Sequence, residues 1–121
     1  MKNLFTLLTV LLLSQSLISQ LSLDLEKSKI KWTGKKITNA SHWGSLSFSE
    51  ANLEFDGNDL IGGKFVVDMN TMSVDDIQGR GKQRLEGHLR NEDFFDVNNH
   101  KEAILMFDQR VPLTNGVYEV S

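Results

Sequence analysis

Polar and apolar residues alternate along much of this chain, and this two-residue period constrains the fold more than any other feature. In 45–49 (SLSFS) each apolar residue stands between serines, and the alternation returns in 52–56 (NLEFD). A two-residue period places successive side chains on opposite faces of a β-strand. The pattern therefore predicts an antiparallel sheet with one buried and one solvated face.

Similar runs elsewhere raise the number of expected strands to six. The runs 45–49 and 52–56 are predicted to form a hairpin, and a turn at Gly57-Asn58-Asp59 follows the second run. Residues 103–107 (AILMF) are apolar throughout, which predicts that one face of that strand meets the core and the other meets a helical insertion. A last strand should follow the Asn115-Gly116 turn. The six predicted strands span 29–33, 45–49, 52–56, 63–69, 103–107 and 117–120.

The segment 75–99 is polar, rich in glycine and without alternation, and we predict that it forms a helical insertion in the sheet. Leu85 and Leu89 are one helical turn apart, which indicates a short helix over 82–90. Asn91 is a good N-cap for a further helical turn through 92–95.

Two adjacent aromatic residues, Phe94 and Phe95, stand between Asp93 and Asp96 in the segment 87–97 (GHLRNEDFFDV). Because large apolar side chains are usually buried, we expect at least one of the two rings to enter a core. The segment is then predicted to close one side or one end of the sheet as a plug.

The N-terminus has the features of a secretory signal peptide. Lys2 supplies a positive charge, residues 4–13 form an apolar run, and small and polar residues follow, so we predict a signal peptide over 1–19 with cleavage before Gln20. The apolar run is too short to span a bilayer, which needs about 20 apolar residues. We therefore expect an exported protein, either periplasmic or secreted, without an integral membrane span.

Composition excludes several functions. The 121 residues carry a formal net charge of −3, which disfavours binding to nucleic acid, and the chain has no cysteine for disulfides, thiol catalysis or zinc. The histidines do not have metal-ligand spacing, and no phosphate-binding glycine loop, nucleophile elbow or His-Glu-x-x-His motif is present. The sequence predicts no enzyme, no metal and no cofactor. The three histidines are His42, His88 and His100.

Several of these pieces, in this order, resemble the YceI family of exported lipocalin-like proteins, which bind isoprenoid or other lipid chains in a barrel. The segment 87–97 is the most specific of them. The matching pieces are 28–32 (SKIKW), 42–44 (HWG), 63–73, 87–97 and 103–107.

The resemblance implies an all-β, mainly antiparallel, lipocalin-like β-barrel over 20–121 with a short helical insertion at about 75–99. About eight strands usually enclose a small-molecule cavity, and family members continue through further strands. Since the chain ends at Ser121 within a predicted strand, we expect the barrel to be incomplete at its C-terminus.

The expected function is to sequester or carry a long-chain lipid, for example an isoprenoid quinone or a polyprenyl lipid. Each buried methylene contributes about 0.8 kcal/mol without a polar partner, so ten contribute about 8 kcal/mol before the costs of ordering. The same side chains could instead fill the barrel as an ordinary core. The predicted cavity-lining residues are Trp32, Leu46, Phe48, Phe65, Val67, Met69, Leu85, Leu89, Phe94, Leu105 and Phe107.

His88 and Arg90, with Arg80 and Arg84 just before them, are candidates for contacts with the polar head of the lipid. A solvated helix face is the alternative for this set. For His42, which stands beside Trp43 in a predicted turn, stacking on a ring or a hydrogen bond to backbone explains the residue better than a ligand contact does.

An alternative from another class of function is a secreted, stress-related interaction protein with a fully packed barrel and no lipid cargo. Large side chains at every inward position would favour it. The sequence also leaves the oligomeric state open, with a homodimer as one alternative.

Overall fold

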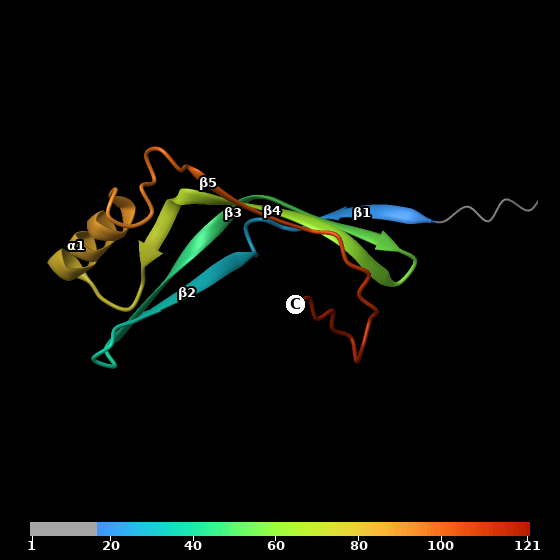
Figure 1. Ribbon diagram of the computed structural model, residues 1–121, viewed down its shortest axis with the longest axis horizontal. Helices are drawn as coiled ribbons and strands as arrows, with labels where there is room; N and C mark the ends of the chain where they lie inside the picture. Colours follow the sequence, from blue (N-terminus) through green and yellow to red (C-terminus); the bar gives the residue numbers. More distant parts are fainter. Residues whose placement is uncertain (1–16) are drawn as a thin grey trace, which may run out of the picture.

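A computed structural model describes residues 17–121 as one antiparallel sheet of five strands with a single helix (Figure 1). The prediction of a mainly antiparallel sheet with a short helix is confirmed. The elements, in chain order, are β1 (Ile18–Ser22), β2 (Lys29–Lys35), β3 (Ser41–Asp56), β4 (Asp59–Val74), α1 (Gly79–Arg90) and β5 (Glu102–Phe107).

The two long strands β3 and β4 form the centre of the sheet. One edge of β3 pairs with β4. The other edge of β3 pairs with β2 near the start of β3 and with β1 near the end of β3, and β5 pairs with the first part of β4. The hairpin predicted between 45–49 and 52–56 is wrong, because both runs belong to β3, which turns back only at Gly57 (φ 60°). Glu50 and Ala51 between the runs are not turn formers, and register shifts beside them bend β3 without ending it.

Strand β1 is an element that the sequence patterns did not predict. Ile18 and Ser19 pair with Asp56 and Phe55 of β3, although both lie within the predicted signal peptide. The first 16 residues of that predicted peptide lie outside the residues that the structure describes. Cleavage before Gln20 would leave three of the five β1 pairs in place.

The predicted strand over 117–120 is wrong. Only an isolated bridge joins Thr114 to Val117 around the Asn115-Gly116 turn. A strand needs a neighbour that exchanges backbone hydrogen bonds, and in this region β4 is already bridged by Val111 and paired with β5. The segment packs instead through Tyr118, whose hydroxyl donates a hydrogen bond to the carbonyl of Asn58 (2.6 Å).

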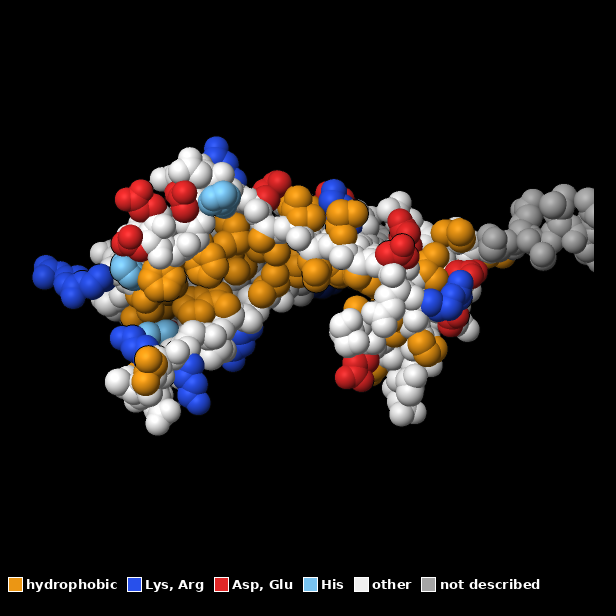
Figure 2. Space-filling view, viewed as in Figure 1, with side chains coloured by type: hydrophobic (Ala, Val, Ile, Leu, Met, Phe, Trp, Pro, Cys, Tyr) orange, Lys and Arg blue, Asp and Glu red, His pale blue; other side chains and the backbone are white. Residues whose placement is uncertain are grey.

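One face of the sheet, which we call the inner face, carries the core. Directly paired residues point to the same side of a sheet, and the pairs Ile30–Leu46 and Phe48–Val67 define this face. Hydrophobic side chains form a band along it, from the end near α1 toward the C-terminal segment (Figure 2). The buried cluster at the α1 end consists of Leu46, Val67, Met69, Met72 and Val97.

The strands approach one another very closely at Gly44 of β3, which is buried. A Cβ atom there would lie 1.7 Å from the carbonyl oxygen of Ser73 and 2.7 Å from Nε1 of Trp32. That indole nitrogen donates a hydrogen bond to the same carbonyl (3.1 Å). Only glycine leaves room for the bond that orients Trp32 on the inner face.

We predict that Gly44→Ala lowers the free energy of unfolding by about 2–4 kcal/mol, because the methyl group overlaps the backbone of β4 and displaces the Trp32 hydrogen bond. Gly87→Ala in α1 is the matched control, since no atom lies within 4 Å of its Cβ position. It should raise the free energy of unfolding by about 0.5–1 kcal/mol. Urea unfolding measures both, and a wild-type midpoint for Gly44→Ala would contradict the packing described here.

Candidate functional site

The inner face has an apolar hollow of about 270 Å³ beside α1, which we call the proximal hollow. Its floor is formed by side chains of the buried cluster and its walls by β2, α1 and the turn that follows α1. Five of the eleven predicted cavity-lining residues meet here, namely Trp32, Leu46, Met69, Leu89 and Phe94. The other lining residues are Thr33, Gly34, Met72 and Phe95.

The two adjacent phenylalanines line this hollow and are not buried in a core. Phe94 is 57% exposed and Phe95 is 48% exposed, so the prediction that one ring is buried is wrong. The backbone explains why, since the N–H of Phe95 bonds to the carbonyl of Leu89 and that of Val97 bonds to the carbonyl of Arg90. These bonds fold the chain back over the end of α1 and place Val97 in the core instead.

Asn91 has a different role from the predicted one. It is the C-cap of α1, and its backbone N–H bonds to the carbonyl of His88. Its side-chain oxygen accepts a hydrogen bond from the N–H of Asp93 (2.9 Å), as in an Asx turn. Residues 92–95 therefore form a hydrogen-bonded turn and not a second helical turn.

A second apolar hollow of about 340 Å³, the distal hollow, lies further along the inner face. Three more predicted residues line it, Phe65, Leu105 and Phe107, together with Leu53, Leu60, Tyr118 and Val120. The ring of Phe65 lies 5.6 Å from that of Phe48 and 6.3 Å from that of Phe107, measured between centroids. This aromatic row extends from the packed region near the proximal hollow into the distal one.

The strand β5 is present as predicted, but its predicted packing is wrong. It contacts β4 alone, whereas α1 contacts a later part of β4, so no helical insertion covers β5. Leu105 on the inner side is 62% exposed, and Ile104 and Met106 on the other side are also exposed. Within residues 17–121, therefore, no helix or strand covers the apolar side chains of β5.

Three predicted cavity residues lie outside both hollows. Phe48 packs against the buried cluster and begins the aromatic row. Val67 is buried within the core cluster. Leu85 lies on another side of α1, where it lines a pocket of about 410 Å³ that we call the basic pocket. The basic pocket is lined by Lys36, His42, Ile77, Gly81, Arg84, Leu85 and His88.

The structure separates the two predicted head-group residues. His88 lines the basic pocket, and its ring meets that of Phe94 edge to face at a centroid distance of 4.9 Å. Arg90 instead donates hydrogen bonds from its guanidinium group to the carbonyls of Met72 and Asn70 of β4. Arg90 thus anchors the helix through Nη2, which donates to backbone carbonyls.

Neither Lys36 nor His42 was predicted to belong to a site. Gly34 and His42 are direct partners in the β2–β3 ladder, so His42 lies on the face that carries Trp32. This register depends on where the loop between the strands begins and ends. No local sequence signal would have placed these residues beside α1.

His42 is held by an acidic partner. Its Nδ1 lies 2.9 Å from Oδ2 of Asp76, while Oδ1 of that carboxylate is buried without a partner in the described part of the chain. Burial raises the pKa of Asp76, but hydrogen bonds from His42 and from the backbone N–H of Trp43 outweigh it, so the pKa of Asp76 lies below its ordinary value. The carboxylate therefore remains an acceptor that fixes the orientation of the imidazole.

Residues 21–120 match the model of the YceI-like domain. The chain belongs to the YceI family. This family is generally associated with isoprenoid or lipid binding and is generally non-enzymatic. Comparison with curated proteins and with solved structures finds no match.

Residues 17–121 contain one helix, α1. The helix in that range is neither long enough nor apolar enough to cross a bilayer. In the same range no three histidine, aspartate or glutamate side chains gather as a metal site would require.

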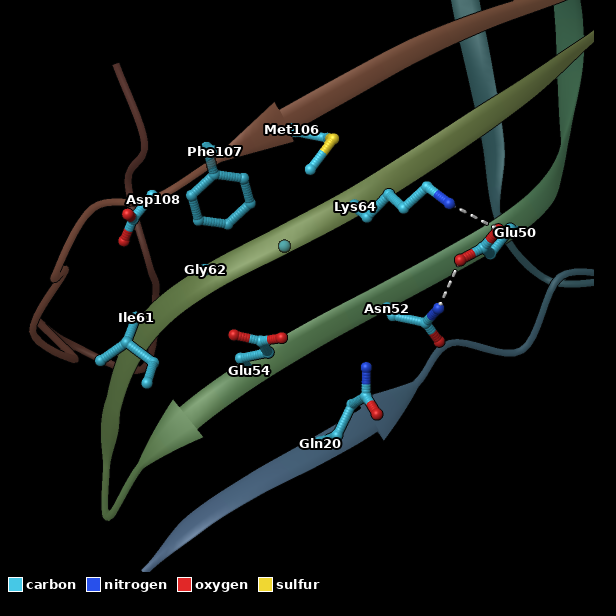
Figure 3. Close-up of a pocket in the computed structure, with 11 residues that line it drawn as sticks. Gln20, Glu50, Asn52, Glu54, Ile61, Gly62, Lys64, Met106, Phe107 and Asp108 are labelled. Atoms are coloured by element: carbon cyan, nitrogen blue, oxygen red, sulfur yellow. Dashed lines mark hydrogen bonds and ion pairs between the residues drawn. The ribbon is translucent and has the colours of Figure 1, made fainter. Parts of the chain in front are cut away.

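The outer face of the YceI-like domain carries a polar groove of about 310 Å³ (Figure 3). Glu50 accepts hydrogen bonds there from Lys64 (3.2 Å) and Asn52 (3.0 Å). Because the side chains of Lys64 and Glu50 are each 42% exposed, this ion pair contributes little to stability. The outer face is a solvated surface, and the apolar hollows belong to the inner face.

Helix α1 of the YceI-like domain is fixed to the edge of β4 by charged side chains spaced four residues apart. Lys82 donates to the carbonyl of Val74 (2.6 Å), and Glu86 accepts from the N–H of the same residue (2.9 Å). Lys82 and Glu86 also form an ion pair (3.3 Å). Arg90, one turn after Glu86, adds hydrogen bonds to the same strand. The position of α1, which forms one wall of the proximal hollow, therefore depends on these contacts.

We predict that Glu86 makes stability depend on pH. Burial raises its pKa, but hydrogen bonds from Val74 and Lys82 lower it by more, so its folded pKa lies below the ordinary 4.5. A lowered folded pKa gives stability that is complete above pH 4.5 and is lost as pH falls through the folded pKa. The free energy of unfolding should therefore fall less steeply below pH 4.5 in Glu86→Gln than in the wild type.

Urea unfolding at several pH values between 6 and 3 measures this slope. Glu92→Gln is the control, because Glu92 is exposed in the turn after α1. Identical slopes for the wild type and Glu86→Gln would show that the carboxylate does not anchor the helix.

Proposed function

We propose that this protein binds an isoprenoid-like or other long-chain lipid, with the tail lying along the inner face of the sheet. The observation that carries the proposal is the proximal hollow, whose walls are apolar and remain open between α1 and β2. The aromatic row from Phe48 to Phe107 offers a continuous path from there toward the distal hollow. The family match supports the same class of ligand.

The energetics favour a long tail over a short one. Association of a ligand costs about 4–15 kcal/mol, and each buried methylene returns about 0.8 kcal/mol. Each hollow has a volume near the lower end of the range for ligand pockets, about 300–1,000 Å³. A tail confined to one hollow would barely offset the cost, so we infer that the lipid extends along both.

The mechanism is non-covalent. Water leaves the inner face and the tail, and the rings of Phe94 and Phe95 cover the tail at one end. We further propose that the curved sheet is one wall of a lipocalin-like barrel around the lipid. Export through the predicted signal peptide would bring the protein to the periplasm or the exterior, where a carrier shields a tail from water.

We predict that Gly34→Phe lowers the affinity for an isoprenoid quinone at least tenfold, because the new ring would occupy the proximal hollow. Gly34 has an ordinary φ, and the nearest atom to its Cβ position is a ring carbon of Trp32 at 3.6 Å. Lys35→Phe is the matched control, since its side chain points to the opposite face. Fluorescence of Trp32 in a Trp43→Phe background reports binding, because Trp43 lies outside the hollow.

Native mass spectrometry of protein isolated from its own envelope fraction completes the test. A stoichiometric adduct with the mass of an isoprenoid lipid is the expected result. If the protein carries no lipid and binds neither quinones nor polyprenols, the proposal is wrong and the interaction protein without cargo takes its place.

A further inference from the structure

Strand β1 contains the peptide bond at which the predicted signal peptide would be cleaved, between Ser19 and Gln20. The mature chain would then begin with a glutamine. Glutamine at an N-terminus has a reaction of its own, because its α-amine can attack its own side-chain carboxamide and close a ring. Whether the fold permits this reaction depends on where β1 places the nitrogen and the side chain of Gln20.

The backbone nitrogen of Gln20 takes no part in the hydrogen bonds of the sheet. Opposite residues in an antiparallel ladder alternate between pairs that exchange backbone hydrogen bonds and pairs that do not. The N–H of Leu23 bonds to the carbonyl of Ala51 (2.9 Å), so Leu21 and Ser19, two and four residues earlier, are also in bonded pairs. Gln20 is therefore in a non-bonded pair, and its N–H and carbonyl point away from β3.

Cleavage before Gln20 thus creates an α-amine at a position where the sheet loses no hydrogen bond to it. Within residues 17–121, β1 pairs with β3 alone, so the edge toward which this nitrogen points is open. A terminus one residue later would instead be the nitrogen of Leu21, which donates to β3. The amine of Gln20 is therefore free to react while β1 remains paired.

The side chain of Gln20 is also free. It is exposed and lies in the polar groove of the outer face, near Asn52 (Figure 3). The carboxamide of Asn52 donates to Glu50 and accepts from Ser22, whereas that of Gln20 makes no hydrogen bond within the described part of the chain. The Gln20 carboxamide can therefore turn toward its own nitrogen without breaking a contact.

We propose that Gln20 is a modification site, at which the mature N-terminus is cyclised to pyroglutamate. The lone pair of the neutral α-amine attacks Cδ of the side-chain carboxamide, and a five-membered lactam forms as the carboxamide C–N bond breaks. The nitrogen leaves as ammonia with a proton from the amine, so the reaction needs no oxidant and no second substrate. An α-amine is partly neutral near neutral pH, and two groups in one residue react far more readily than separate molecules.

The ring would protect β1 from exopeptidases. It replaces the free α-amine that aminopeptidases recognise with a neutral lactam. Without it, stepwise removal of Gln20 and Leu21 would take away the pair between Leu21 and Leu53. Chain termini are preferred sites of proteolysis, and β1 is an edge strand. A ring at the first residue of an edge strand is compatible with the sheet, as proline is there.

The intact mass of protein isolated from its own envelope fraction tests the modification. The expected chain begins at Gln20 and is lighter by one ammonia already at harvest. A chain that begins at Gln20 with its full mass, or that loses ammonia only during storage, overturns the inference. A chain that begins at another residue overturns the predicted cleavage site and this inference with it. Neither result depends on lipid binding.

Gln20→Asn is the matched variant, because its carboxamide is one methylene shorter and could close only a strained four-membered ring. Stepwise chemical sequencing should read its N-terminus, whereas the wild type should be blocked. An aminopeptidase should remove the first residues of Gln20→Asn and leave the wild type intact until a pyroglutamyl peptidase has removed the ring. If the aminopeptidase acts equally on both untreated proteins, the protective role is wrong, and equal unfolding midpoints confirm that both are folded.

Discussion

The free edge of β4 is the constraint on which the candidate site depends. Pairing with β5 ends at Asp68, although β4 continues to Val74, so several backbone groups of its last part need other partners. Backbone polar groups that are buried without a partner are costly. Helix α1 supplies partners through Lys82, Glu86 and Arg90, whose spacing matches the helical turn and places their side chains along that edge. An exposed strand edge is also a site of aggregation, and this cover protects it.

Because these contacts fix the rotation of α1 against the edge of β4, they also determine what its other sides face. Leu89 faces the proximal hollow, while Arg84 and His88 face the basic pocket. One short helix thereby separates an apolar compartment from a positive one, and the contact between His88 and Phe94 marks their boundary.

Local patterns predicted the parts of the fold that local physics determines. Alternation located β2, two runs within β3 and the middle of β4. A continuous apolar run located β5, and the spacing of Leu85 and Leu89 located α1. What could not be predicted depends on contacts distant in sequence. Bulges let β3 continue where a hairpin was predicted. Backbone hydrogen bonds in the turn after α1 leave Phe94 at the surface. The register of β2 and β3 brings His42 to the inner face. Arg90 illustrates the same limit, because its partners are carbonyls of a strand some twenty residues earlier.

The apolar surface left on the inner face argues for a ligand. Monomeric soluble proteins rarely expose large contiguous apolar patches, and those that do usually bind something there. In this domain Phe94, Phe95 and Leu105 are each about half exposed or more, and they lie at the two hollows, of which the proximal one stays unfilled beside Gly34. A larger apolar residue at position 34 would close the proximal hollow and bury more apolar surface, which would stabilise the fold. The open hollow therefore represents stability that the sequence gives up, and binding of a lipid tail would recover it by covering the same surface.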